Sequence, residues 1–331
     1  MKVGEVGEFG LIDLLARKVA GAPGQSSRPD RLIIGIGDDT AAWRCDSAIE
    51  LATVDSLVQD IHFSLETATW RELGWKSLAI NLSDIAAMGG VPGYALVALD
   101  LPEDTEVEDV TALYEGMLDL AGRTGTAIAG GNISGSPVVS ITVTVIGSGR
   151  GDKLLRRSTA RPGDVIAVTG HLGTAAAGLE MLTKKLAFGP EATGYLRDAF
   201  LHPVPRLDEG RVLIENGIAT AIDISDGLIA DLRHICEASR VGARVHADKL
   251  PVHQTVKDSF GEKALELALG GGEDYELLFT GAADTVARAG AAMACPVTVI
   301  GEITGGKTGH IDLVNAAGRA VKADRTGWRH F

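Results

Sequence analysis

Five short motifs built around carboxylate or amide side chains constrain this chain more than any other feature of its sequence. Most of them end an apolar, β-branched run at a glycine-rich turn, where strands stop and functional groups are displayed. Clustered carboxylates repel one another and are costly to bury unless a cation neutralises them. Magnesium prefers such hard oxygen ligands and takes phosphates as co-ligands, so the pattern predicts a metal-dependent nucleotide site. The motifs are Asp38-Asp39, Thr53-Val54-Asp55, Asn81-Leu82-Ser83-Asp84, Gly130-Gly131-Asn132 and Asp223-Ile224-Ser225-Asp226-Gly227.

The composition narrows the class of protein. The 331 residues are 45% hydrophobic and 23% charged, which is typical of a globular chain of two domains. The formal net charge of -13 argues against nucleic acid and anionic membranes as partners, because both attract basic surfaces. Cys45, Cys236 and Cys295 are too far apart to suggest a zinc site or a disulfide framework. An acidic N-terminus and the lack of a long apolar run predict a cytoplasmic protein.

The alternation of strands and helices predicts an α/β chain with two domains, residues 1–150 and 151–331. A polar stretch from 148 to 162 is expected to connect them. In this interpretation Gly130-Gly131-Asn132 is a turn between two strands. Helices are expected at 9–20, 70–88, 107–122 and 228–239, and strands at 32–36, 49–53, 94–100, 127–129, 138–146, 165–169, 219–224, 275–280 and 296–303.

Residues 301–308 satisfy a phosphate-binding loop pattern, G-x-x-x-x-G-K-[ST], but their context predicts a hairpin. A phosphate-binding loop needs a helix that begins at the lysine, because the free amides of that helix hold the phosphate. Here Lys307 and Thr308 are followed by Gly309 and then by the alternating run 311–314, which is typical of a strand. Together with the strand-like run before it, this segment is expected to form a β-hairpin, with Lys307 remote from any phosphate.

Ten segments spread along the chain, taken in order, resemble one known family. They are 7–10, 37–39, 53–55, 58–63, 81–90, 130–132, 161–164, 223–228, 271–279 and 327–331. Each is short, but the ordered set is similar to that of the thiamine-monophosphate kinases. The resemblance implies the two-domain α/β fold of the aminoimidazole ribonucleotide synthetase superfamily. In that fold the N-terminal domain binds ATP and magnesium and contributes strands to a homodimeric β-barrel, while the C-terminal domain closes the active-site cleft.

The resemblance also implies the reaction. ATP would phosphorylate thiamine monophosphate to thiamine diphosphate, the last step of thiamine diphosphate biosynthesis, with several magnesium ions. Positioning and charge neutralisation supply most of the catalysis of phosphoryl transfer. The acceptor phosphate is already ionised near neutral pH, so we expect direct in-line transfer with no covalent or general-base residue.

The matching positions imply three groups of site residues. Asn132 stands where many family members have Asp, which lowers the negative charge expected there. The metal ligands would be Asp39, Thr53, Val54, Asp55, Asp84, Asn132, Asp223 and Asp226. ATP would contact Tyr114, Gly131, Asn132, Arg157 and Ser225. The thiamine phosphate would contact His62, Glu273 and Trp328.

Plainer roles remain open for several of these residues. A single Asp after a strand is often a turn former or helix cap. Tyr114 lies on an apolar helix face, where core packing explains it as well. Arg156 and Arg161 compete with Arg157 for the phosphate contact, and Trp328 can serve as a hydrophobic anchor for the C-terminal tail.

Two other functions compete with the kinase. A synthetase of the same superfamily, such as a selenophosphate or hydrogenase-maturation enzyme, would carry a reactive Cys or selenocysteine near its start or a Cys tail. The first Cys here is Cys45, and the chain ends in His330-Phe331. A non-catalytic binder of thiamine phosphates would not need so many metal ligands.

Overall fold

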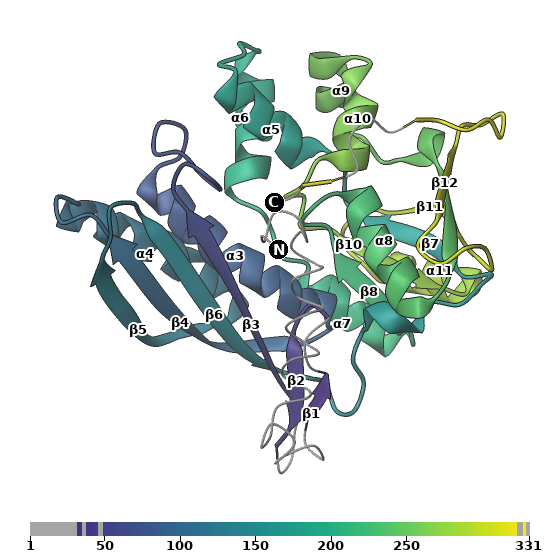
Figure 1. The fold of residues 1–331 in the computed structure, drawn as a ribbon, viewed down its shortest axis with the longest axis horizontal. Coiled ribbons are helices and arrows are strands. Elements are labelled where there is room, and N and C mark those ends of the chain that lie inside the picture. The colour runs from purple at the N-terminus through teal and green to yellow at the C-terminus, as the bar shows by residue number, and fades with distance from the viewer. Residues whose placement is uncertain (1–31, 35–37, 46–48, 323–326, 329–331) are drawn as a thin grey trace, which may run out of the picture.

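The chain folds into two six-stranded mixed sheets that lie side by side, each with its own helices (Figure 1). The computed structural model describes residues 32–34, 38–45, 49–322 and 327–328. The helix expected at 9–20 lies outside these residues. None of the described helices is long and apolar enough to cross a lipid bilayer.

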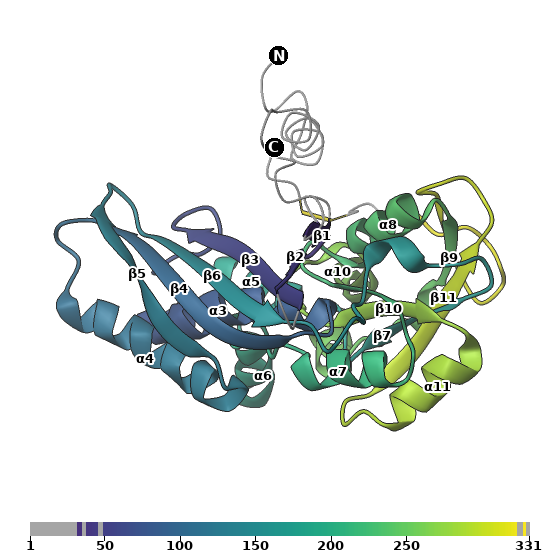
Figure 2. The ribbon, with the colours of Figure 1, turned by 90° about the horizontal axis from the view of Figure 1, so that it is seen from below.

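The first sheet has the order β1-β2-β3-β6-β4-β5, and its neighbours are antiparallel except for the parallel pair β4 and β5. Two helices cover one face of it, and no described helix covers the other (Figure 2). Its strands are β1 (Leu32–Ile34), β2 (Ala41–Arg44), β3 (Ile49–Val58), β4 (Val91–Leu101), β5 (Ala127–Gly135) and β6 (Ser140–Ser148). The helices are α3 (Trp70–Ala87) and α4 (Val107–Thr124).

Helix α3 positions much of the chemistry described below, and its ends are set by local sequence. Thr69 and Glu72 form a reciprocal capping box at its start, which satisfies backbone N–H groups that have no partner inside the helix. The helix ends before Gly89, whose φ of 67° lies in the left-handed region. Almost every residue between these ends is buried, because α3 packs on the first sheet, on α4 and on elements of the second half. The expected helix at 70–88 is therefore confirmed.

The second sheet has the order β12-β9-β11-β7-β10-β8, with helices on both faces. β7 is apolar from Val165 to Val168, because Ile166 and Val168 pack towards α8 and α10 while Ala167 packs towards α7 and α11. The strands are β7 (Val165–Thr169), β8 (Thr220–Asp223), β9 (Gly242–His246), β10 (Leu277–Gly281), β11 (Val297–Thr304) and β12 (Ile311–Val314). The helices are α5 (Thr174–Thr183), α6 (Pro190–Leu201), α7 (Leu207–Glu215), α8 (Leu228–Ser239), α9 (Gln254–Phe260), α10 (Lys263–Gly270) and α11 (Ala283–Ala291), with 3-10 turns η1 (Arg157–Thr159) and η2 (Ala247–Lys249).

Two motifs expected in turns lie inside strands instead. β3 continues to Val58, so Asp55 pairs with Val143 of β6 in mid-strand. β5 runs through Gly130-Gly131-Asn132, and Asn132 pairs with Ala98 of β4. A Cβ on Gly131 would lie 1.7 Å from the Val97 carbonyl oxygen, so this glycine permits a close approach of two strands rather than a turn.

The hairpin predicted around Lys307 is wrong in its pairing. Both strands exist, as β11 and β12, but β12 pairs in parallel with β9, which lies between them in the sheet. The connection from 305 to 310 therefore crosses over β9. No helix begins at Lys307, and this residue is exposed, so the interpretation against a phosphate-binding loop agrees with the fold.

Among the described residues of one chain, neither sheet closes on itself, so the homodimeric β-barrel stays a prediction. The edge strands are β1 and β5 in the first sheet and β12 and β8 in the second. The described fold thus supports two α/β halves of the expected kind.

Candidate active site

Three carboxylates from distant parts of the sequence meet between the two halves. Asp39, Asp84 and Asp223 each offer an oxygen within 4.8 Å of the others. Asp39 follows β1, Asp84 lies in the last turn of α3, and Asp223 ends β8. All three were expected as metal ligands, and the fold brings them together.

Strand β3 adds two predicted residues to this cluster and turns a third away. Alternate residues of a strand point to opposite faces, so Thr53 and Asp55 share the face that packs on α3. The Thr53 hydroxyl donates a hydrogen bond to the Asp84 carboxylate, and Asp55 is close enough to raise the pKa of Asp84. The side chain of Val54 points to the other face and is 59% exposed. Since this side chain has no oxygen or nitrogen, only the Val54 backbone carbonyl could serve as a ligand.

The carboxylates strongly disfavour one another's ionisation. Burial, reinforced by the charges of Asp55, Asp223 and Asp39, raises the pKa of Asp84 well above its usual range. Burial and the charge of Asp39 raise the pKa of Asp223 to about 8, although the Ser83 hydroxyl donates a hydrogen bond to it at 2.7 Å. A divalent cation held by these oxygens would remove the repulsion, so the donor set fits magnesium.

Arg157 is placed beside the cluster rather than free to reach a phosphate. Its Nε and Nη2 donate to the two oxygens of Asp39 at 3.0 and 2.6 Å. Burial alone would lower the pKa of Arg157, but the Asp39 carboxylate raises it above its usual range. A phosphate contact by Arg157 would therefore require it to share or leave this bidentate pair.

A second group of side chains that could bind a metal lies just after Asp223, in the loop that follows β8 and in α8. Asp226, Asp231 and His234 also have ligand atoms within 4.8 Å of one another. The Asp231 carboxylate accepts the N–H groups of Asp226 and Gly227 at 3.2 and 3.0 Å, so it shapes the loop from 223 to 227. Burial lowers the pKa of His234 to about 4, which leaves this imidazole neutral at pH 7.

Three further predicted residues gather on the loop from 223 to 227. The Ser225 carbonyl accepts the N–H of Glu273 at 2.7 Å, and the Asp226 carbonyl accepts the N–H of Trp328 at 3.0 Å. A Cβ on Gly272 would lie 2.4 Å from the Ser225 carbonyl oxygen, so a glycine is needed for this approach. The structure thus brings Ser225, Glu273 and Trp328 to the same loop as Asp223 and Asp226.

Other predicted residues lie apart from the carboxylates within one chain. Gly131 and Asn132 are exposed on β5, three strands from β3, which corresponds to about 14 Å at normal strand spacing. Tyr114 packs against the core from α4. His62 lies in the turn after β3, where its Nδ1 accepts the N–H of Val58 at 3.0 Å.

Two residues at the site were missed by the sequence interpretation. Ser83 binds Asp223, and Lys76, which is 1% exposed, forms an ion pair with Glu273 at 2.9 Å. They are seven residues apart, which puts them on one face of α3. A lysine among the mostly apolar residues 73–82 was the available signal, because lysine is seldom fully buried without a partner.

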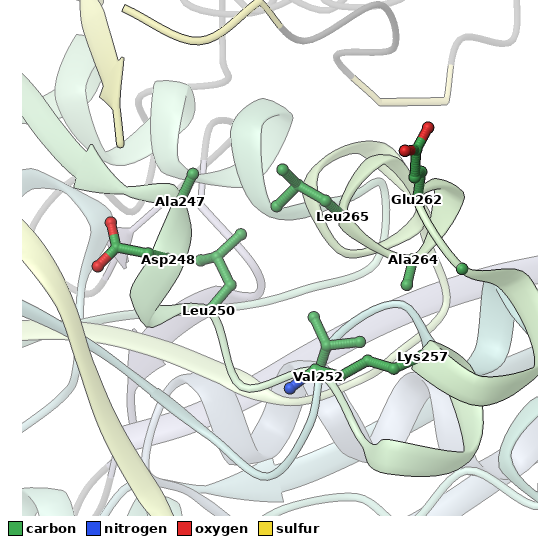
Figure 3. Close-up of a pocket in the computed structure, with 9 residues that line it drawn as sticks. Ala247, Asp248, Leu250, Val252, Lys257, Glu262, Ala264 and Leu265 are labelled. Carbon is green, nitrogen blue, oxygen red and sulfur yellow. The ribbon is translucent and has the colours of Figure 1, made fainter. Parts of the chain in front are cut away.

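A surface hollow of about 320 Å³ lies elsewhere, between η2, α9 and α10 (Figure 3). Its lining includes Asp248, Leu250, Val252, Lys257 and Glu262. None of the predicted site residues lines it, so it gives no reason to move the site away from the carboxylates.

Family models and individual relatives of known function place this chain in the same family. Residues 37–149 match the family model for the AIR synthase related protein, N-terminal domain, and residues 161–314 match that for the C-terminal domain. The thiamine-monophosphate kinase of Salmonella typhimurium is 39% identical over 98% of both chains. The corresponding protein of Aquifex aeolicus is 34% identical over 100% of both chains.

Solved structures agree with the sequence matches. A structure described as AaThiL complexed with AMPPCP and TMP has a TM-score of 0.87 at 33% identity and covers 100% of this chain and 99% of its own. A complex of the hydrogenase maturation proteins HypE and HypF has a TM-score of 0.73 at 18% identity, covering 95% of this chain and 99% of its own, which shows a shared fold alone. With its full-length relatives and both domain models matched in order, this chain belongs to the thiamine-monophosphate kinases of the AIR synthase related family.

Proposed function

We propose that this protein transfers the terminal phosphoryl group of ATP directly to thiamine monophosphate, giving ADP and thiamine diphosphate, as the last step of thiamine diphosphate biosynthesis. The carboxylate cluster of Asp39, Asp84 and Asp223 carries the proposal, because it suits phosphoryl transfer assisted by divalent cations. The similar structure with AMPPCP and TMP supports the choice of donor and acceptor. We also propose a domain boundary at about residue 150, between the two matched segments.

Magnesium is the proposed cofactor, since it offsets the charge on phosphate oxygens when it is bound. Asp39, Asp55, Asp84 and Asp223 would hold it at the cluster, with oxygens of Thr53 and Val54 beside them and Asp226 on the adjoining loop. Tyr114, Gly131, Asn132, Arg157 and Ser225 would serve ATP, and His62, Glu273 and Trp328 would serve the thiamine phosphate.

ADP formation should depend on both magnesium and thiamine monophosphate, with free thiamine a poor acceptor. The acceptor must bring its own ionised phosphate oxygen, because no general base is assigned to activate a hydroxyl. A coupled ADP assay with thiamine monophosphate, with thiamine and with neither checks this. Rapid ADP release without any thiamine phosphate, or efficient use of free thiamine, would contradict the proposal.

We further propose that two copies pair through the uncovered face of the first sheet. Val54, Tyr94 and Leu96 are exposed there by 59%, 59% and 41%, and β5 is an open edge. Exposed apolar side chains beside an unpaired strand favour a symmetric partner. If the first sheets of the two copies closed into a barrel, β5 of each copy would also lie against its partner.

Light scattering at micromolar concentration should report a dimer. Leu96→Glu should shift the protein towards monomer, because it buries an unpaired charge in the interface. Leu118→Glu is the matched control, since Leu118 is 55% exposed on α4, away from that face. A monomeric parent protein, or equal effects of the two changes, would oppose the dimer.

Lys307→Ala should leave the KM for ATP and the kcat within about twofold of the parent values, because exposed loop substitutions usually change little. Lys307 lies in the crossover between β11 and β12, where no helix begins. Steady-state kinetics at varied ATP concentration test this. A severe loss of turnover in a stably folded variant would place the nucleotide at this loop instead.

A further inference from the structure

Lys76 is a fully buried lysine whose ion-pair partner, Glu273, lies outside the cluster of Asp39, Asp84 and Asp223. Its side chain is 2% exposed, and its Nζ lies 3.5 Å from the centre of the Phe200 ring on α6. Burial lowers the pKa of Lys76, and the Glu273 carboxylate raises it part of the way back. The lysine comes from α3, whereas Phe200 and Glu273 belong to the second half of the chain.

Glu273 is the member of this pair that faces outward. Its side chain is 25% exposed, and its Oε1 lies 2.9 Å from the Lys76 Nζ. The backbone of Glu273 has a φ of 68°, a left-handed conformation that costs a non-glycine residue free energy and persists only when its surroundings fix it. Here the N–H bond to Ser225 fixes the backbone, and Lys76 fixes the carboxylate.

Stability alone does not account for this ion pair. Two apolar residues of similar size would often serve a buried position equally well, because desolvating two charges offsets much of their attraction. Lys76 instead pairs with Glu273, whose N–H binds the Ser225 carbonyl of the loop from 223 to 227. The position indicates that the lysine serves the orientation of Glu273 at this loop.

We propose that Lys76 is a positioning residue for substrate binding: it holds the Glu273 carboxylate in the orientation that receives the cationic, ring-bearing end of the acceptor. This inference rests on the proposed function. Lys76 itself is covered by Phe200 and Glu273, so it acts through Glu273 and not by touching the acceptor.

A double-mutant cycle on the full-length protein tests the proposal. Lys76→Met keeps the length of the side chain but removes its charge. It should raise the KM for thiamine monophosphate about tenfold, with the kcat and the KM for ATP within about twofold. In the Glu273→Gln background the same change should raise the KM for thiamine monophosphate by less than about twofold, because the group through which Lys76 acts is already gone.

Thermal denaturation gives a readout of the pair that needs no activity. Glu273→Gln leaves the buried ammonium group of Lys76 without its partner, so the Tm of this variant should be lower than that of the parent protein. Adding Lys76→Met should restore the Tm. Lys184→Met is the control for loss of a lysine from an ion pair, since Lys184 pairs with Glu180 on the surface. It should change neither the Tm nor the KM values appreciably.

The outcomes separate the two proposals. Three outcomes would overturn the role of Lys76 but not the proposed function. They are an unchanged KM for thiamine monophosphate in Lys76→Met, equal rises in the KM values for both substrates, and the same rise with and without Glu273→Gln. A parent protein that makes no ADP from thiamine monophosphate in the same assay would overturn the proposed function, and this inference with it.

Discussion

Replacing Asp84 by Asn should reduce the kcat by a factor of about a hundred or more while the protein remains folded. Asp84 is surrounded by the charges of Asp55, Asp223 and Asp39 and receives the Thr53 hydroxyl. Asn keeps the shape and one oxygen but removes the charge that a metal-phosphate complex would need, and losses of this type typically cost about 3 kcal/mol in the transition state. Folding should survive because the substitution also removes repulsion from a crowded group of carboxylates.

Steady-state kinetics and a melting curve together check this expectation. Asp104→Asn is a suitable control, because Asp104 is exposed in the connection between β4 and α4. We expect the Tm of metal-free Asp84→Asn to equal or exceed that of the parent protein. Near-normal turnover by the folded variant would remove Asp84 from the site.

The metal-free protein should become less stable as the pH rises from about 6 to 8, and magnesium should reverse the trend. Burial and Asp39 raise the pKa of Asp223 to about 8, whereas an unfolded aspartate titrates near 3.9. Between these values the folded state binds a proton that the unfolded state does not, so its stability is highest at low pH and falls as the pH rises. One such group contributes at most about 1.4 kcal/mol per pH unit.

Melting curves at pH 6, 7 and 8, with and without magnesium, measure this effect. A fall of about 2 °C per pH unit is expected without metal for a chain of this size. Magnesium should raise the Tm more at pH 8 than at pH 6, because carboxylates must lose their protons to bind it. Asp223→Asn should flatten the metal-free slope, and a magnesium effect that is equal at all three pH values would argue against a carboxylate-bound metal.

For the elements that they identified, local signals predicted the bounds of helices better than those of most strands. The helix at 228–239 agrees with α8 in both bounds, and α3 follows its capping box and its terminal glycines. Gly130-Gly131, in contrast, suggested a turn, but neighbouring strand β4 holds these glycines in the sheet. The pairing of β12 with β9 depends on contacts across about seventy residues, which short-range patterns do not contain.

Site residues that belong to the acidic motifs were predicted from the sequence. Residues whose role depends on contacts between distant parts of the chain were missed. The motif order identified Asp39, Asp84 and Asp223, and the fold joins these three. The pairing of Arg157 with Asp39 was not apparent, because either residue alone also suits a phosphate or metal contact. Lys76 was missed, since its partner Glu273 lies almost two hundred residues further along the chain.

Helix α3 fixes the spacing between the two ends of the proposed site. Lys76 and Asp84 are eight residues apart, and at 1.5 Å per residue the helix separates them by about 12 Å along its axis. Inserting one residue between them would turn Asp84 by about 100° relative to Lys76 and break either the Glu273 contact or the carboxylate cluster. The segment between them therefore cannot change in length without moving one end of the site relative to the other, and acceptors much longer or shorter than the native one should be poor substrates.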